Sequence, residues 1–105
     1  MIAKTPRPPY YAVIFTSLRT DVEKGSYLET AERMLELAQE QQGFLGMESA
    51  REECVGITVS YWESLDAIKI WKGHAEHLVA QEKGKSVWYK AFKTRISRVE
   101  RDYEF

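Results

Sequence analysis

Residues 56–84, GITVSYWESLDAIKIWKGHAEHLVAQEKG, decide the fold, because a strand runs directly into a helix there. Apolar and polar side chains alternate over 55–62, which predicts a strand. After Ser64, a residue typical of helix caps, the apolar residues recur every three or four positions, which predicts a helix. Gly73 predicts a kink or break in this helix, and Gly84 its end. The helix also carries His74 and His77, so we expect one wall of any functional site here.

Toward the N-terminus, the sequence predicts an arm, a strand and a helix. Residues 1–9 contain all three prolines and are expected to form an extended, poorly anchored arm. Residues 10–19, YYAVIFTSLR, are apolar on both alternating faces, as in a strand covered on both sides. Ser26 and Glu29 match a capping box at the start of an amphipathic helix, which Gly43 is positioned to end.

Three further segments complete the predicted order. Residues 44–51 form a strand that a turn at 52–54 joins to the strand at 55–62. Residues 86–92, SVWYKAF, are expected to form a helical turn that buries Trp88 and Phe92, and residues 93–105 a last strand. The order β-α-β-β-α-β is the split βαβ pattern of ferredoxin-like α+β folds, with an antiparallel sheet and both helices on one face. Residues 10–105 are therefore expected to be one domain.

The second face of this sheet would carry too many apolar side chains for a monomer. The simplest arrangement that covers them is a homodimer in which two sheets face each other as an α/β barrel, with the last strand reaching across.

The composition excludes several classes of protein. Fifteen basic and 16 acidic residues give a net charge of −1, so we expect neither nucleic acid nor a membrane surface as a partner. The single cysteine, Cys54, rules out an internal disulfide. The N-terminal apolar run is too short for a signal peptide, and no run approaches a membrane span, so we expect a cytoplasmic protein.

The segments GFLGMESAREE, GITVSYWESLDAIKIWKGHAEHLVAQ, WY and RVERDY resemble the antibiotic biosynthesis monooxygenase superfamily. The most specific element is GFLG, a strand, YWES and then a helix with the pattern W-x-x-H-x-x-H. The resemblance spans Tyr10 to Tyr103 and implies a dimeric α+β barrel with a pocket between sheet and helices. Some members oxidise phenolic or quinol-like substrates with O₂ and neither metal nor flavin, others degrade haem, and many have no known reaction.

The haem branch fits this sequence less well. Haem-degrading relatives carry an Asn on the first strand, where this chain has Thr16 and Ser17. Their iron-ligating His falls about three turns after the equivalent of Trp71, where this chain has Gln81. His74 and His77 come earlier. We therefore expect no cofactor, with haem as the alternative.

Oxygenation without a cofactor requires a base, because a phenol reduces O₂ more easily once it is deprotonated. His74 lies about 60° around the helix from Trp71 and is the candidate base; the alternative is an exposed helix residue. A small aromatic substrate would then contact Trp62, Trp71, His77, Trp88 and Ser17. The tryptophans could instead be core and His77 a surface residue.

Other side chains admit two interpretations. Arg51, Arg95 and Arg98 could bind an acidic substrate or pair with Glu48 and Glu100 across strands. His74 and His77 lack a third ligand at a signature spacing, so no metal site is expected. Two function classes remain, which are an oxygenase acting on a small aromatic molecule and a dimeric binding protein without catalysis.

Overall fold

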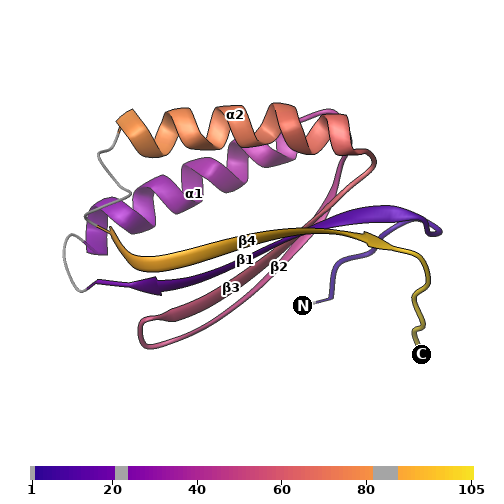
Figure 1. Cartoon of the computed structure of the whole chain (residues 1–105), viewed down its shortest axis with the longest axis horizontal. Coiled ribbons are helices and arrows are strands. Elements are labelled where there is room, and N and C mark those ends of the chain that lie inside the picture. The colour runs from indigo at the N-terminus through magenta and orange to yellow at the C-terminus, as the bar shows by residue number, and fades with distance from the viewer. Residues whose placement is uncertain (1, 21–23, 82–87) are drawn as a thin grey trace.

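The fold is a four-stranded antiparallel sheet with two helices on one side. The computed structural model describes residues 2–20, 24–81 and 88–105. Its elements are β1 (Tyr10–Arg19), α1 (Lys24–Glu40), β2 (Phe44–Glu52), β3 (Val55–Trp62), α2 (Leu65–Gln81) and β4 (Tyr89–Val99). The strands lie in the order β2-β3-β1-β4, and both helices cover the same side of the sheet (Figure 1). The predicted ferredoxin-like α+β fold is confirmed.

The predicted bounds of the first three strands were accurate to within one residue, whereas those of the last strand were wrong. β1 and β3 have the predicted bounds, and β2 is one residue longer. β4 runs from Tyr89 to Val99, so residues 89–92 belong to a strand rather than to the expected helical turn, and the last strand ends at Val99 rather than at residue 105. Trp88 is helical, and residues 86 and 87 lie outside the described residues. Trp88 is buried as predicted, but Phe92 lies in β4 and is 43% exposed. Pairing of β4 with β1, which sets Phe92 opposite Ser17, favours the strand.

The helix ends show which local signals act. The Ser64 hydroxyl accepts a hydrogen bond from the Ala67 N–H at 3.1 Å and caps α2 as predicted. α1 begins at Lys24, before Ser26, so the expected capping box lies inside the helix. Gly43 has a φ of 90° beyond the end of α1, the backbone conformation that favours glycine. Gly73 neither breaks nor ends α2, since a glycine costs only about 1 kcal/mol in a helix held by packing. Gly84 lies outside the described residues.

The core lies between α2 and one end of the sheet. Trp62 is completely buried and packs with Ala67 and Ile68 of α2. Its ring stacks on Trp71 with centroids 6.0 Å apart, and its indole N–H donates to the Ser60 hydroxyl at 2.9 Å. Trp62 and Trp71 are therefore packed against each other at this end of the sheet.

The N-terminal arm is better anchored than the sequence suggested. The Ala3 N–H donates to a Glu48 carboxylate oxygen at 2.8 Å, and the Thr5 hydroxyl donates to the Tyr10 hydroxyl at 3.0 Å. Tyr10 in turn donates to Asp102 at 2.6 Å, so both ends of the chain are hydrogen-bonded to the sheet.

Candidate functional site

The strand register divides the sheet into a helix-facing side and an open side. Rows of four residues cross the helix-facing side. At the end covered by α2, the row contains large side chains: Arg98, Tyr11, Trp62 and Phe44. At the end nearest the β2–β3 hairpin, the row is Phe92, Ser17, Gly56 and Arg51. Ser17 and Gly56, on its two central strands, have small side chains, so little side-chain volume covers the sheet there.

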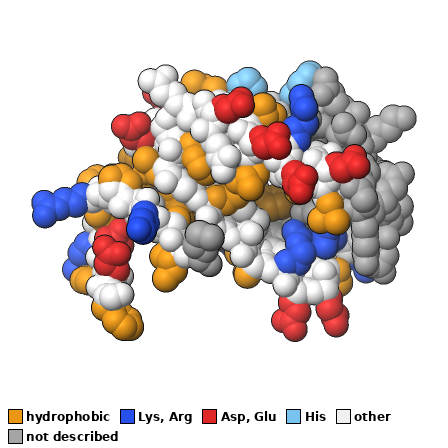
Figure 2. Space-filling model, turned by 180° about the vertical axis from the view of Figure 1, so that it is seen from behind, with side chains coloured by type: hydrophobic (Ala, Val, Ile, Leu, Met, Phe, Trp, Pro, Cys, Tyr) orange, Lys and Arg blue, Asp and Glu red, His pale blue; other side chains and the backbone are white. Residues whose placement is uncertain are grey.

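A groove of about 500 Å³ lies at the edge of the sheet along β2, between α1 on the helix-facing side and the N-terminal arm, which is hydrogen-bonded to Glu48 on the open side. The N-terminal arm, α1 and β2 line it with Ile2, Ala3, Lys4, Leu35, Gln39, Phe44, Gly46, Met47 and Ser49. Most of this surface is apolar, and the side chains of Lys4, Gln39 and Ser49 supply polar groups. Figure 2 shows a hollow with hydrophobic side chains between the helices and the sheet on this face of the molecule. The groove suits a small, largely apolar molecule.

Arg51 follows Ser49 on the same side of β2 and therefore lies just beyond the groove. A Cβ atom built on Gly56 would lie 2.9 Å from Nη2, 3.0 Å from Cζ and 3.1 Å from Nη1 of Arg51. These nearly equal distances mean that the guanidinium lies flat against the strand at Gly56. The buried glycine is what makes room for it.

Glu48 does not pair with Arg51, contrary to one of the two interpretations of the sequence. Its register position is on the open side, where one carboxylate oxygen accepts a hydrogen bond from the Tyr61 hydroxyl at 2.7 Å and the other from Ala3. The hydrogen bond from Tyr61 and then that from Ala3 lower the pKa of Glu48. Burial, followed by the hydrogen bond to Glu48, raises the pKa of Tyr61 to about 12. Glu48 is thus charged and Tyr61 neutral at pH 7.

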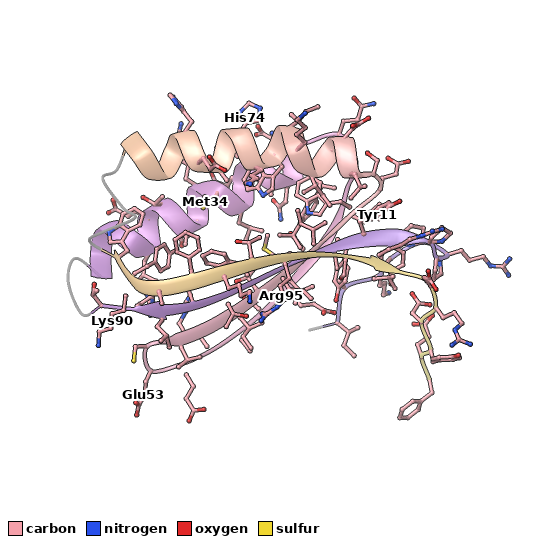
Figure 3. All side chains as sticks on the ribbon, in the orientation of Figure 1. Tyr11, Met34, Glu53, His74, Lys90 and Arg95 are labelled. Atoms are coloured by element: carbon pink, nitrogen blue, oxygen red, sulfur yellow. The ribbon has the colours of Figure 1, made fainter. Side chains whose placement is uncertain are left out.

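The two histidines lie away from the groove. His74 and His77 are exposed, and Figure 3 shows His74 on the side of α2 that points away from the sheet. The structure therefore does not place the candidate base between the sheet and the helices.

The other predicted site residues are interior residues. Trp62, Trp88 and Ser17 are each 2% exposed or less, and Trp71 is half-buried against Trp62. None of them is among the residues that line the described groove. The groove is lined instead by Leu35 and Gln39 of α1 and by Met47 and Ser49 of β2, none of which was predicted as a site residue. The one available signal was the alternation of β2, which sets Met47, Ser49 and Arg51 on one side.

The family assignment rests on a match over most of the chain. Residues 9–83 match the model of the family described as antibiotic biosynthesis monooxygenase. This chain belongs to that family. The chain is also 55% identical to the uncharacterized protein YqjZ of Bacillus subtilis (strain 168), over 99% of this chain and 91% of that protein.

Solved structures confirm the fold of this family member. SnoaB, a cofactor-independent oxygenase from Streptomyces nogalater, superposes with a TM-score of 0.67 at 9% identity, covering 92% of this chain and 97% of SnoaB. PA3566 from Pseudomonas aeruginosa superposes with a TM-score of 0.69 at 12% identity, covering 93% and 99% of the two chains. Among the described residues, no helix is long and apolar enough to cross a membrane.

Proposed function

We propose that this family member is a cofactor-independent monooxygenase that oxidises a small aromatic, quinol-like molecule in the groove between α1 and β2. The observation that carries the proposal is the groove itself, a largely apolar space of about 500 Å³ along the β2 edge of the sheet, in a chain of the monooxygenase family. The cofactor-independent activity of SnoaB, a protein of the same fold, supports the absence of a cofactor.

The proposed chemistry uses the substrate as the reductant. A phenolate transfers an electron to O₂, and the ring carbon and oxygen then combine to a peroxide. Loss of water leaves a ketone, so that a ring CH₂ of the keto tautomer and O₂ yield C=O and H₂O. The protein has to bind the planar ring, exclude water and favour the phenolate over the phenol. The apolar side chains of Leu35, Phe44 and Met47 serve the first two tasks.

A second candidate is a binding protein without catalysis. Histidine is the side chain best suited to take a proton near pH 7. Because both histidines are exposed and neither lines the groove, the binding protein is favoured. The haem alternative would require His74 or His77 to ligate iron from the outer side of α2. Haemin titration of the protein and of the variants His74→Ala and His77→Ala tests it, since a saturable Soret shift lost in one variant would identify a haem ligand.

Oxygen consumption with a panel of naphthalenediols and anthrones separates the two main candidates. We expect consumption of one O₂ per substrate molecule and at least a tenfold lower rate in Met47→Trp, whose side chain would fill the groove. Met34→Trp is the size-matched control, because Met34 is a half-buried α1 residue outside the groove lining. Saturable binding of the same compounds without O₂ consumption would instead support the binding protein.

We also propose a homodimer formed by the open sides of two sheets. Apolar side chains on this side remain exposed: Leu18, Val55 and Ile57. The β4 edge of the open side carries Lys93 and Arg95, and Figure 3 shows Arg95 below the sheet, away from the helices.

The charges of the open side favour one orientation of the second copy. The β2 edge carries Glu48 and Glu52, opposite in sign to Lys93 and Arg95 of the β4 edge. A twofold axis parallel to the strands places the β2 edge of one copy over the β4 edge of the other and brings these charges together.

Light scattering after size-exclusion chromatography tests the dimer. We expect Ile57→Lys, on the open side, to yield a monomer. Ile70→Lys is the matched control, because Ile70 is 60% exposed on α2 and should leave the dimer intact. A monomeric native protein at micromolar concentration would contradict the proposal.

A further inference from the structure

We propose that Lys4, on the N-terminal arm, binds the acidic oxygen of the ligand, so that the groove takes an aromatic molecule with a phenolate or carboxylate group. The inference deepens the proposed function and rests on it for the site, although it does not depend on turnover. It assigns a substrate class that the apolar lining alone does not define, and it makes the arm a wall of the site.

The first argument is the charge of the groove. Lys4 is the one charged residue among the described residues that line it. Gln39 and Ser49 are polar but neutral, and the other lining residues are apolar or glycine. A ligand in contact with this lining meets a positive charge and no negative one, which favours an anion over a cation.

The second argument is the place of the ammonium group. Lys4 lines the groove and is nevertheless an exposed residue. A lysine packs its methylene stem along apolar surface and keeps its ammonium group in water. The charge of Lys4 therefore belongs at the mouth of the groove. There a ligand can bury its rings beside Leu35, Phe44 and Met47 while its acidic oxygen stays partly hydrated, which avoids the cost of removing a charged group from water.

The third argument is that the residues on both sides of Lys4 are anchored. The Ala3 N–H donates to a Glu48 carboxylate oxygen at 2.8 Å, and the Thr5 hydroxyl donates to the Tyr10 hydroxyl at 3.0 Å. The side chain of Lys4 thus extends from a held segment beside β2 rather than from a loose terminus. Less conformational freedom is then lost when it binds an anion.

Gly46 is what lets the arm lie so close to β2. A Cβ atom built on Gly46 would lie 3.0 Å from the Cβ of Ala3, which is tighter than an ordinary contact between carbon atoms. Gly46 also lines the groove. The contact between arm and strand, and with it the position of Lys4, therefore depends on the absence of a side chain at residue 46.

A positive charge at the mouth also serves the proposed chemistry. An ammonium group near a phenol oxygen stabilises the charged form and lowers the pKa of the bound phenol. The phenolate is the form that transfers an electron to O₂. Lys4 therefore acts on the reactivity of a bound phenol as well as on its affinity.

Calorimetric titration with 2-naphthoate and with the neutral 2-naphthamide tests the inference. We expect the ratio of the two affinities to fall about fivefold in Lys4→Gln, the upper end of the range for an exposed ion pair, with the affinity for naphthamide unchanged. Lys4→Arg keeps the charge and should retain most of the ratio. Lys69→Gln is the matched control and should leave the ratio unchanged, because Lys69 is an exposed residue of α2 outside the groove lining.

Two further measurements separate a charge effect from a structural one. Added salt should lower the ratio in the native protein but not in Lys4→Gln, because salt screens exposed charges. The absorption band of bound 2-naphtholate should appear at a lower pH with the native protein than with Lys4→Gln. Gly46→Val displaces Ala3 and should lower the ratio although Lys4 is intact, and an unchanged ratio would contradict the role of the arm.

A ratio that persists in Lys4→Gln would overturn the inference, as would the failure of the native protein to bind either compound. Charge-selective binding that depends on Lys4, without O₂ consumption by any phenol, would refute the oxygenase and leave the anion site standing. O₂ consumption together with equal ratios in the native protein and in Lys4→Gln would do the reverse.

Discussion

Replacing Gly43 by alanine should destabilise the protein strongly, because this position combines a positive φ with a close contact. The φ of 90° costs a residue with a Cβ atom about 1–2 kcal/mol. The added Cβ would lie 2.8 Å from the Cβ of Ala67, whereas carbon atoms in good contact are about 3.5–4.0 Å apart. Overpacking of this kind costs typically about 1–3 kcal/mol.

The backbone at Gly43 has little freedom to relieve this contact. The Gly43 carbonyl accepts a hydrogen bond from the Glu63 N–H at 2.8 Å, which fixes it next to the start of α2. We therefore expect Gly43→Ala to lower the free energy of unfolding by about 3 kcal/mol. The start of β2, whose Phe44 lines the groove, would shift with it.

Gly73→Ala is the matched control for the same chemical change. Gly73 lies inside α2, and a Cβ atom built on it meets no heavy atom within 4 Å. Alanine should stabilise the helix there by about 0.5–1 kcal/mol. Urea unfolding followed by circular dichroism, at one protein concentration for all variants, measures both changes. The reasoning is refuted if Gly43→Ala unfolds within about 0.5 kcal/mol of the native protein, or if both variants shift in the same direction.

Four further predictions concern single side chains. Tyr61, with its pKa raised from 10.0 to about 12, contributes stability that is complete below pH 10 and is lost as the pH rises to about 12; thermal melts should show a smaller loss over this range in Tyr61→Phe. Glu48, with its pKa lowered, contributes stability that is lost as the pH falls through its folded-state pKa, so acid unfolding of Glu48→Gln should be less steep. Ser64→Ala removes the cap on the Ala67 N–H and should cost about 1 kcal/mol in urea unfolding. His74→Ala should leave O₂ consumption within about twofold, because His74 is exposed on the outer side of α2; a larger loss would place a catalytic group there.

Local patterns were sufficient for most of the fold. The apolar run of β1, the alternation in β3 and the cap at Ser64 depend on neighbouring residues only, and the structure has the two strands and the cap as predicted. The start of β4 is different. Tyr89 and Phe92 pack their rings on Phe15 of β1, with centroids 5.6 and 5.5 Å from it. Contacts between such distant segments leave no local periodicity, so the predicted helical turn wrongly extended over residues 89–92, which lie in β4.

The position of His74 could have been estimated better from the helix itself. At 100° per residue, Ile68 and Ala75 lie about 60° and 40° from Trp71 in one direction, and His74 about 60° in the other. Ile68 is buried and Ala75 half-buried, so the buried arc is centred on the far side of Trp71 from His74. The orientation of Arg51 could not have been obtained in this way, because it depends on the register that sets it opposite Gly56.

The hydrogen bonds at the two chain ends bear on how this protein should be handled in the laboratory. Ala3 is bound to Glu48 and Asp102 to Tyr10, and both ends of the chain lie below the sheet, away from the helices (Figure 1). An affinity tag or a fluorescent fusion at either terminus would therefore emerge beside the surface through which we expect two copies to associate. A tag inserted at the β2–β3 turn, where Glu53 has a positive φ, would leave both ends free but approach Arg51. Cleaving the tags before measuring association or ligand binding avoids both artefacts.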